Sequence, residues 1–327
     1  MRIFCLPLLL TASVLAAAED SVDSDILELR SEDAAVRDAA QRRLIEKGES
    51  ALGACRRVLE SEKDAEAASR LREICARIEQ RKKIKAVQEL WRDRWFVDSI
   101  AGTEVGWLHL SARSTMIDGK AGWTFVFECQ NETPGMRTTW RCKTTCRDDD
   151  DLTPKELEWS EDDTDIEDNK VSTEHLRQRV LVGTDSFEVE VLDGENPALK
   201  LGKGEKRTLQ IERAGTPLSI GHVDFYLAEM QLATGREAVR RLGFSPKEPT
   251  RGVERIWTLG KAEDIEIGAD TISTVTLSDP DDLGAGKYWV SESRGVVKFE
   301  SLGVTTVLSD ESGVEKLKLR LLKQNSK

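Results

Sequence analysis

The sequence predicts an α+β protein, with a short α-helical segment at the N-terminus followed by a curved antiparallel β-sheet that carries one or two helices. Three observations lead to this fold class. Helical periodicity runs from Asp25 to about Trp91. Short β-rich runs separated by turn clusters fill Gly252–Leu308, as in a meander of antiparallel strands. Residues Trp123–Gln130 alternate aromatic and other side chains with period two, which indicates a strand with one aromatic face.

The extreme N-terminus has the features of an export signal. Arg2 supplies a positive charge, Ile3–Leu10 begins a short apolar run, and Ala16–Ala18 offers small residues before Glu19. This run is shorter than the ~20 residues that a membrane-spanning helix needs. We therefore predict a cleaved signal peptide at residues 1–18, a periplasmic or secreted mature protein, and no integral membrane span.

The net charge of the chain indicates which classes of partner it is not suited to bind. The formal net charge is −12 at pH 7, whereas a nucleic-acid binder needs clustered positive charge to displace counterions. Nucleic acid is therefore excluded as a partner, and anionic membrane surfaces are disfavoured for the same reason.

The helical segment is predicted over residues 19–91. In its first helix an apolar stripe at Val36, Ala40 and Leu44 follows capping residues, and Gly48 ends the helix. A second helix follows. A third opens at Asp64, and the chain repeats faintly at an offset that aligns Asp33 with Asp64 and Ala40 with Leu71.

The residues from Asp33 to Ala40, together with Leu44, resemble HEAT-like repeats, and the resemblance covers about two units. Helical units of this kind stack against one another, and longer arrays form binding surfaces. The resemblance implies that residues 19–91 pack as a small helical cap or dock a protein partner.

Five cysteines remain after removal of the signal peptide: Cys55, Cys75, Cys129, Cys142 and Cys146. Export would place them in an oxidising compartment. Cys55 and Cys75 lie on successive predicted helices and could form a disulfide, or both could be small core residues. Cys142 and Cys146 cannot bond if they lie on one strand, because four residues of strand span about 13 Å.

The β-rich domain is predicted over residues 92–327. Trp123, Phe125, Phe127 and Cys129 share one face of a strand, and the strand that answers it carries Trp140. Phe225–Leu242 reads as a helix across the sheet. We expect an apolar ligand to contact the large apolar side chains of these elements, namely Trp107, Trp123, Phe125, Phe127, Trp140, Phe225, Met230 and Trp289.

Two parts of the β-rich domain carry a family resemblance. Trp95–Trp107 has an aromatic strand, a Gly turn and then Val-Gly-Trp, and Glu263–Thr274 with Tyr288–Lys298 provides a similar closing pattern. These segments resemble envelope proteins of the DUF3108 and lipoprotein-carrier (LolA-like) type, roughly over residues 95–145 and 170–308. The resemblance implies a half-barrel sheet whose concave face takes acyl chains, with Leu218–Met230 as its plug or lid.

A strongly acidic stretch interrupts this domain at residues 147–169. Clustered carboxylates suit Ca²⁺, but the spacing does not match an EF-hand loop. Blocks of like charge are usually solvated. We therefore predict an exposed loop here.

Catalytic motifs are not evident in the sequence. The three histidines, His109, His175 and His222, have no metal-binding spacing, and neither a G-x-S-x-G elbow nor a phosphate-binding loop is present. The cluster Cys142–Cys146, with basic neighbours, is the only suggestion of a reactive thiol. We predict that the protein is not an enzyme and uses no cofactor or metal.

Together these features predict an exported, non-catalytic bacterial envelope protein whose β-rich domain binds an apolar or acyl ligand or a lipoprotein. The alternative is a protein-interaction or structural module in which the HEAT-like helices dock a partner.

Overall fold

The computed structural model describes residues 21–133, 135–167, 170–212, 215–245, 247, 249–250, 252–278 and 286–324. The predicted signal peptide, residues 1–18, lies outside these residues. The chain divides into two compact units, Met1–Ala86 and Val87–Lys327. Across the described ranges, no helix combines the length and the apolarity that a membrane-spanning segment needs.

The first unit is helical. Residues 21–28 form a helix, and three more follow: α2 (Ala34–Lys47), α3 (Glu49–Leu59) and α4 (Ala65–Gln88). The weak internal repeat has a structural counterpart, because Asp33 caps α2 and Asp64 caps α4. Asp33 Oδ1 accepts from the Ala35 N–H and Asp64 Oδ1 from the Ala67 N–H, each at 2.8 Å.

The cysteines of this unit are free thiols. Cys55 and Cys75 are buried in the helical core beside Leu44 and Leu71. Burial, and then the neighbouring Cys75, raises the pKa of Cys55 to about 11. The three cysteines of the second unit are also buried and free, and Cys142 and Cys146 lie on one strand.

The second unit is built on one large sheet, which has 16 strands among the described residues. The first nine strands are β1 (Arg94–Ile100), β2 (Thr103–Ile117), β3 (Lys120–Thr133), β4 (Met136–Arg147), β5 (Pro154–Glu167), β6 (Lys170–Val182), β7 (Ser186–Asn196), β8 (Leu201–Gly202) and β9 (Lys206–Gln210). The others are β10 (Leu218–Ile220), β11 (Ala238–Phe244), β12 (Val253–Ile267), β13 (Asp270–Ser278), β14 (Lys287–Ser291), β15 (Gly295–Ser301) and β16 (Val304–Ser309).

The architecture predicted from the sequence is wrong, although the α+β class is right. The expected half-barrel is replaced by a much larger mixed sheet, in which the β10–β11 pair is parallel. Pairing of β1 with β16 joins the N-terminal strands to the C-terminal meander. This pairing makes the N-terminal strands and the C-terminal meander parts of one sheet. Local periodicity cannot predict it, because the two strands are about 200 residues apart in sequence.

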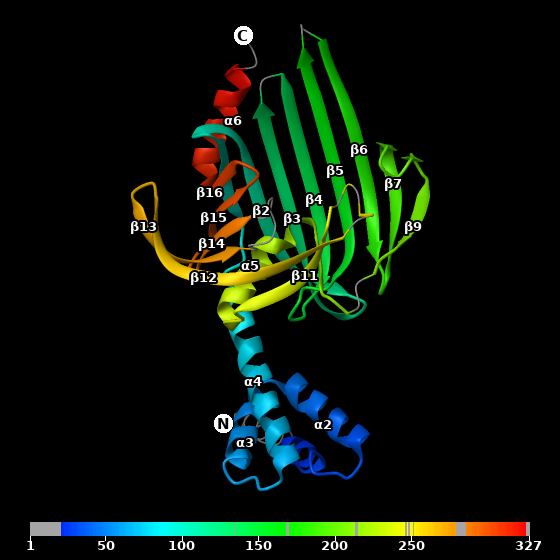
Figure 1. Cartoon of the computed structure of the whole chain (residues 1–327), viewed down its shortest axis with the longest axis vertical. Helices are drawn as coiled ribbons and strands as arrows, with labels where there is room; N and C mark the ends of the chain where they lie inside the picture. The colour runs from blue at the N-terminus through cyan, green and yellow to red at the C-terminus, as the bar shows by residue number, and fades with distance from the viewer. Residues whose placement is uncertain are drawn as a thin grey trace, which may run out of the picture. The chain divides into compact units, whose positions relative to one another are not determined.

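The two ends of the sheet face each other. In Figure 1, β11 and β12 cross in front of the lower parts of β3–β5. Phe244 of β11 meets Phe187 of β7 edge to face at 4.8 Å between ring centroids. Asn196 Nδ2 donates to the Lys247 carbonyl at 2.8 Å. The core of the unit therefore lies between the two ends of its own sheet.

Helix α5 (Asp224–Thr234) fills this interior, and the short turn η1 (Gly221–Val223) leads into it. Phe225, Tyr226, Leu227, Ala228 and Met230 are all buried. The sequence predicted a single helix over 225–242. The helix instead ends at Gly235, whose left-handed backbone (φ 66°) caps it, and the chain continues as β11.

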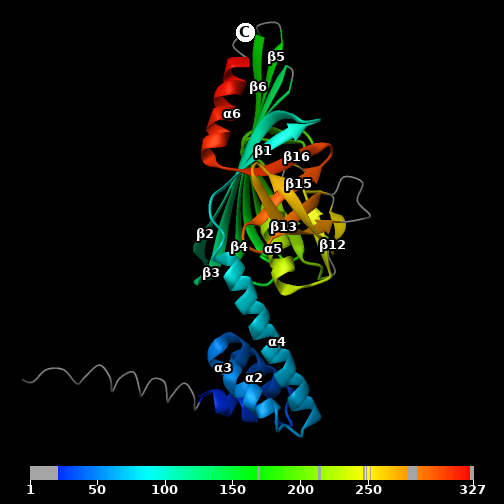
Figure 2. The ribbon, with the colours of Figure 1, turned by 90° about the vertical axis from the view of Figure 1, so that its left-hand side faces the viewer.

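Helix α6 (Glu311–Gln324) packs on the opposite face of β1 and β2 (Figure 2). Lys318 Nζ lies over the Trp95 ring at 4.9 Å and over the Trp107 ring at 4.2 Å from their centroids. The next residue along β1, Phe96, points the other way and packs on Phe225 of α5. Both faces of β1 are thus covered by a helix.

The predicted exposed loop at 147–169 is wrong for most of its length: residues 148–153 connect β4 to β5 without regular structure, but Pro154–Glu167 form the strand β5. In β5 the buried residues Leu157, Trp159 and Glu161 alternate with outward-facing acidic ones. Cross-strand partners of opposite charge offset the repulsion, as in the 3.6 Å pair of Glu158 with Arg177. We predicted a loop from the density of acidic residues alone. That density conceals the alternation of buried and exposed positions along the strand.

A buried ion pair ties α5 to both halves of the sheet. Arg94 Nη1 at the start of β1 binds Glu229 Oε1 of α5, and both side chains are almost fully buried. The same carboxylate oxygen accepts the Val296 N–H of β15 at 2.9 Å. The Arg94 guanidinium also lies over the Tyr226 ring at 5.1 Å.

Replacing Glu229 should therefore destabilise the second unit strongly. We expect Glu229→Ala to lower the free energy of unfolding by about 3–5 kcal/mol, because it leaves the Arg94 charge buried without its carboxylate. Urea unfolding followed by tryptophan fluorescence measures this, since all eight tryptophans lie beyond residue 90. The control Glu315→Ala removes an exposed ion pair with Lys318 and should cost less than about 1 kcal/mol. Equal losses in the two variants would contradict the role of the buried pair.

Candidate functional site

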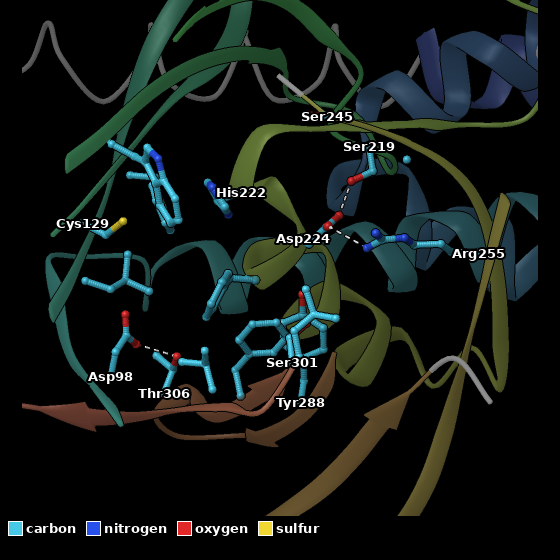
Figure 3. Close-up of a pocket in the computed structure, with 18 of the residues that line it drawn as sticks. Asp98, Cys129, Ser219, His222, Asp224, Ser245, Arg255, Tyr288, Ser301 and Thr306 are labelled. Atoms are coloured by element: carbon cyan, nitrogen blue, oxygen red, sulfur yellow. Dashed lines mark hydrogen bonds and ion pairs between the residues drawn. The ribbon is translucent and has the colours of Figure 1, made fainter. Parts of the chain in front are cut away.

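A cavity of about 530 Å³ lies inside the second unit, between α5 and the inner face of the sheet. Its walls come from both halves of the sheet, with residues from β1–β4 on one side and from β11, β12 and β14–β16 on the other. Pockets of ~300–1,000 Å³ are typical for small-molecule ligands. Figure 3 shows this cavity with its polar side chains labelled.

Aromatic side chains make much of the wall. Phe127, Trp140, Phe225, Tyr288 and Phe299 all line the cavity. Phe225 lies 5.5 Å from both Tyr288 and Phe299 between ring centroids, so these three rings form one cluster. Such a wall favours an apolar ligand and presents ring faces and edges to it.

One side of the cavity carries Asp98. Its side chain points inward from β1, beside Phe96 on the same face, and Oδ1 accepts the hydroxyl of Thr306 at 2.6 Å. A register shift in the β1–β2 pairing falls between Asp98 and Ser99, and irregularities of this kind re-aim side chains. Burial raises the pKa of Asp98, and the hydrogen bond from Thr306 opposes that shift in part.

Gly106 leaves room for an asparagine side chain on this side of the cavity. Gly106 pairs with Asp98 on one side and with Asn131 on the other. A Cβ at Gly106 would lie 2.0 Å from Asn131 Oδ1, so a larger residue would displace the amide. The absence of a side chain at Gly106 therefore sets the position of Asn131, which lines the cavity near Asp98.

The opposite side carries Asp224, at the start of α5 (Figure 3). Ser219 Oγ donates to its Oδ1, and Arg255 Nη1 lies 3.9 Å from its Oδ2. Burial raises the pKa of Asp224, while the Ser219 hydrogen bond and the charges of Arg255 and Arg241 oppose the shift. This carboxylate is thus held by groups of the protein itself.

His222 and Cys129 also line the cavity, as do Ser245 and Ser301. His222 stacks on Phe127 with 3.4 Å between ring centroids, and burial lowers its pKa to about 3, so it is neutral. Burial, and then the charge of Asp98, raises the pKa of Cys129 well above its usual value. The Ser219 hydroxyl donates to Asp224, not to His222. These contacts activate neither the Ser219 hydroxyl nor the Cys129 thiol as a nucleophile.

Three of the eight side chains predicted to contact a ligand line this cavity, namely Phe127, Trp140 and Phe225. Phe125 packs on Tyr226 in the adjoining core, with ring centroids 4.4 Å apart. Met230 is buried within α5.

The other three predicted residues lie elsewhere. Trp107 is on the outer face of β2 under Lys318. The Trp123 indole donates to Asp148 at 3.1 Å. The Trp289 indole donates to Glu263, and its ring lies between Lys287 and Lys298. Period-two alternation groups residues on one face of a strand, but it does not say which face becomes the interior.

The polar residues of the cavity were missed in the sequence. Asp98 offered a signal, because it shares the inward register of Phe96 in β1, a face that also holds the charged Arg94. No sequence signal marked Ser219, Asp224 and Arg255. These residues come together only when distant segments of the chain approach each other in the folded sheet. Among the described residues, no group of three His, Cys, Asp or Glu side chains could hold a metal ion.

Comparisons with known proteins do not assign this chain to a family. No family model matches the sequence, and no curated protein matches it. Among solved structures, the chain is similar to a DUF1089-family protein of Pseudomonas aeruginosa, with a TM-score of 0.29 and 12% identity over 59% of this chain and 90% of that one. A similarity at this TM-score supports no argument. The HEAT-like and DUF3108/LolA-like resemblances therefore stay predictions.

The raised pKa of Asp98 makes a pH-dependent contribution to stability. A carboxyl whose pKa is higher in the folded state stabilises the fold below its unfolded pKa, and this contribution is lost as the pH rises through the folded pKa. The neutral variant Asp98→Asn should therefore gain stability relative to the wild type at pH 7, and the gain should shrink as the pH falls toward 4.

Urea unfolding at a series of pH values tests this expectation. The matched control Asp118→Asn makes the same substitution at an exposed turn residue and should stay within about 0.5 kcal/mol of the wild type. A stability difference between Asp98→Asn and the wild type that does not change with pH would contradict the raised pKa.

Proposed function

We propose that the protein is an exported, non-catalytic binding protein that takes a small apolar ligand, such as an acyl chain, into the cavity of its second unit. The observation that carries the proposal is the cavity itself, with its aromatic wall and its few polar groups. Pockets with these features are the usual sites of small-molecule binding.

The mouth of the cavity supports an apolar ligand. Leu302 and Val253 both line the cavity, and they are 84% and 43% exposed. Leu302 occupies the turn between β15 and β16 with a left-handed backbone (φ 50°), where a β-turn normally places Gly, Asn or Asp. An entering apolar ligand would contact both of these exposed side chains.

Export rests on the sequence. The positive residue, short apolar run and small-residue site at residues 1–18 support cleavage and a periplasmic or secreted location. The resemblance to lipoprotein-carrier proteins points to the same compartment and to acyl chains as ligands.

A variant at the mouth tests the proposal without disturbing the fold. N-phenyl-1-naphthylamine, an uncharged dye that fluoresces in apolar surroundings, should bind the wild-type protein at one site. Leu302→Asn suits the left-handed backbone, so its stability should stay within about 0.5 kcal/mol of wild type. Dye affinity should fall about three- to tenfold, because ~1 kcal/mol of apolar contact is lost.

The matched control is Met116→Asn. Met116 is 67% exposed and lies at the end of β2, away from the residues that line the cavity. Its replacement should leave dye affinity unchanged. The proposal fails if the wild-type protein shows no saturable dye binding, or if the two variants lose affinity equally.

A further inference from the structure

One buried hydroxyl in the cavity has no hydrogen-bond partner among the described residues. Tyr288 of β14 lines the cavity (Figure 3) and is only 4% exposed. Within the described part of the chain, no group accepts a hydrogen bond from its phenol or donates one to it. A buried tyrosine hydroxyl usually has a partner, because burial without one destabilises the protein. The open hydroxyl of Tyr288 therefore points to a partner on a ligand.

Other hydroxyls of the lining are already engaged. Ser219 donates to Asp224, and Thr306 donates to Asp98. The imidazole of His222 resembles the phenol, because its ring nitrogens form no hydrogen bond with any residue that the structure describes. It is neutral, since burial lowers its pKa to about 3. The groups that the cavity offers to a ligand in this way are thus uncharged donors and acceptors.

The surroundings of these groups disfavour charge. Burial raises the pKa of Asp98 and of Asp224 and lowers that of His222, so each group is shifted toward its neutral form. The phenol of Tyr288 stays protonated, because burial raises its pKa well above the usual value. An ionised head group on a ligand would lose its hydration in the same surroundings. An uncharged head group avoids that loss.

We propose that the ligand is an uncharged carbonyl compound, an apolar molecule whose ester, amide or ketone oxygen accepts a hydrogen bond from the phenol of Tyr288. This proposal rests on the proposed function and specifies the ligand class for the same cavity. The hydrocarbon part of the ligand lies against Phe225 and Phe299, whose ring centroids are 5.5 Å and 4.5 Å from that of Tyr288. Free fatty acids and protonated amines are then disfavoured.

The variant Tyr288→Phe removes only the hydroxyl. Because no described residue hydrogen-bonds this group, the variant should unfold in urea at a midpoint no lower than that of the wild type. Methyl octanoate, titrated with the full protein at pH 7 by isothermal calorimetry, should bind Tyr288→Phe about three- to tenfold more weakly than wild type. Butylbenzene, which has no hydrogen-bonding atom, should bind both proteins equally.

The matched control is Tyr226→Phe, at the other tyrosine of the chain. Tyr226 is buried in α5 and is not among the residues that line the cavity. Its replacement makes the same chemical change outside the site. The affinity for methyl octanoate, measured well below the unfolding transition of the variant, should therefore equal that of the wild type.

Two further probes test whether the head group must be uncharged. Octanoic acid and octylamine carry a chain of the same length, and both are mostly ionised at pH 7. Each should bind the wild-type protein at least about tenfold more weakly than methyl octanoate, because its charge has to be neutralised or stripped of water on entry.

The outcomes distinguish the two proposals. If Tyr288→Phe binds methyl octanoate as tightly as the wild type, or loses affinity for butylbenzene to the same extent, the hydrogen bond from Tyr288 is overturned and the apolar binding function stands. Tighter binding of octanoic acid or octylamine than of methyl octanoate overturns the uncharged head group. No heat of binding from any probe, together with no dye binding, overturns the binding function and the carbonyl ligand with it.

Discussion

The pairing of β1 with β16 is the constraint on which the second unit depends. It joins the first and the last strand of the chain at the middle of the sheet order, and it places Asp98 opposite Thr306, 208 residues away in sequence. The interior that results is wide enough for α5, and the cavity remains beside that helix. The Arg94–Glu229 pair then fixes α5 to β1 and to β15. Folding of this unit requires such long-range contacts to form, and their closure entropy has to be offset by the buried core.

The same construction places a carboxylate in an apolar interior. Burial of Asp98 disfavours its ionised form, so the fold would be more stable with a neutral side chain there. Asp224 is buried as well, but Ser219, Arg255 and the start of a helix surround it. Perturbed ionisable groups in a cavity are typical of functional sites.

Part of this structure could be predicted from the sequence. Period-two alternation at Trp123–Cys129 predicted a strand and grouped Phe125 with Phe127 on one face, as observed. Asp33 and Asp64 were both recognised as helix starts. These features are local, because a few neighbouring residues determine them. The HEAT-like docking role of residues 19–91 stays a prediction.

The other features of the structure depend on contacts between distant segments, which no local sequence pattern predicts. Trp107 was expected to contact the ligand, yet it lies on the outer face of β2 under α6. The prediction was wrong because the alternation of side chains along β2 does not show which face points to the interior. The acidic residues of β5 suggested a loop, since their cross-strand partners come from other parts of the chain. Asp98 and Thr306 become neighbours only when the sheet joins β1 to β16.

Native mass spectrometry of the protein purified from the cells that produce it, followed by organic extraction, is the most direct test of ligand binding in the cavity. We expect a non-covalent one-to-one adduct that enters the organic phase, as an apolar ligand would. A bare polypeptide mass in gently handled preparations, with nothing recovered in the organic phase, would contradict the proposal.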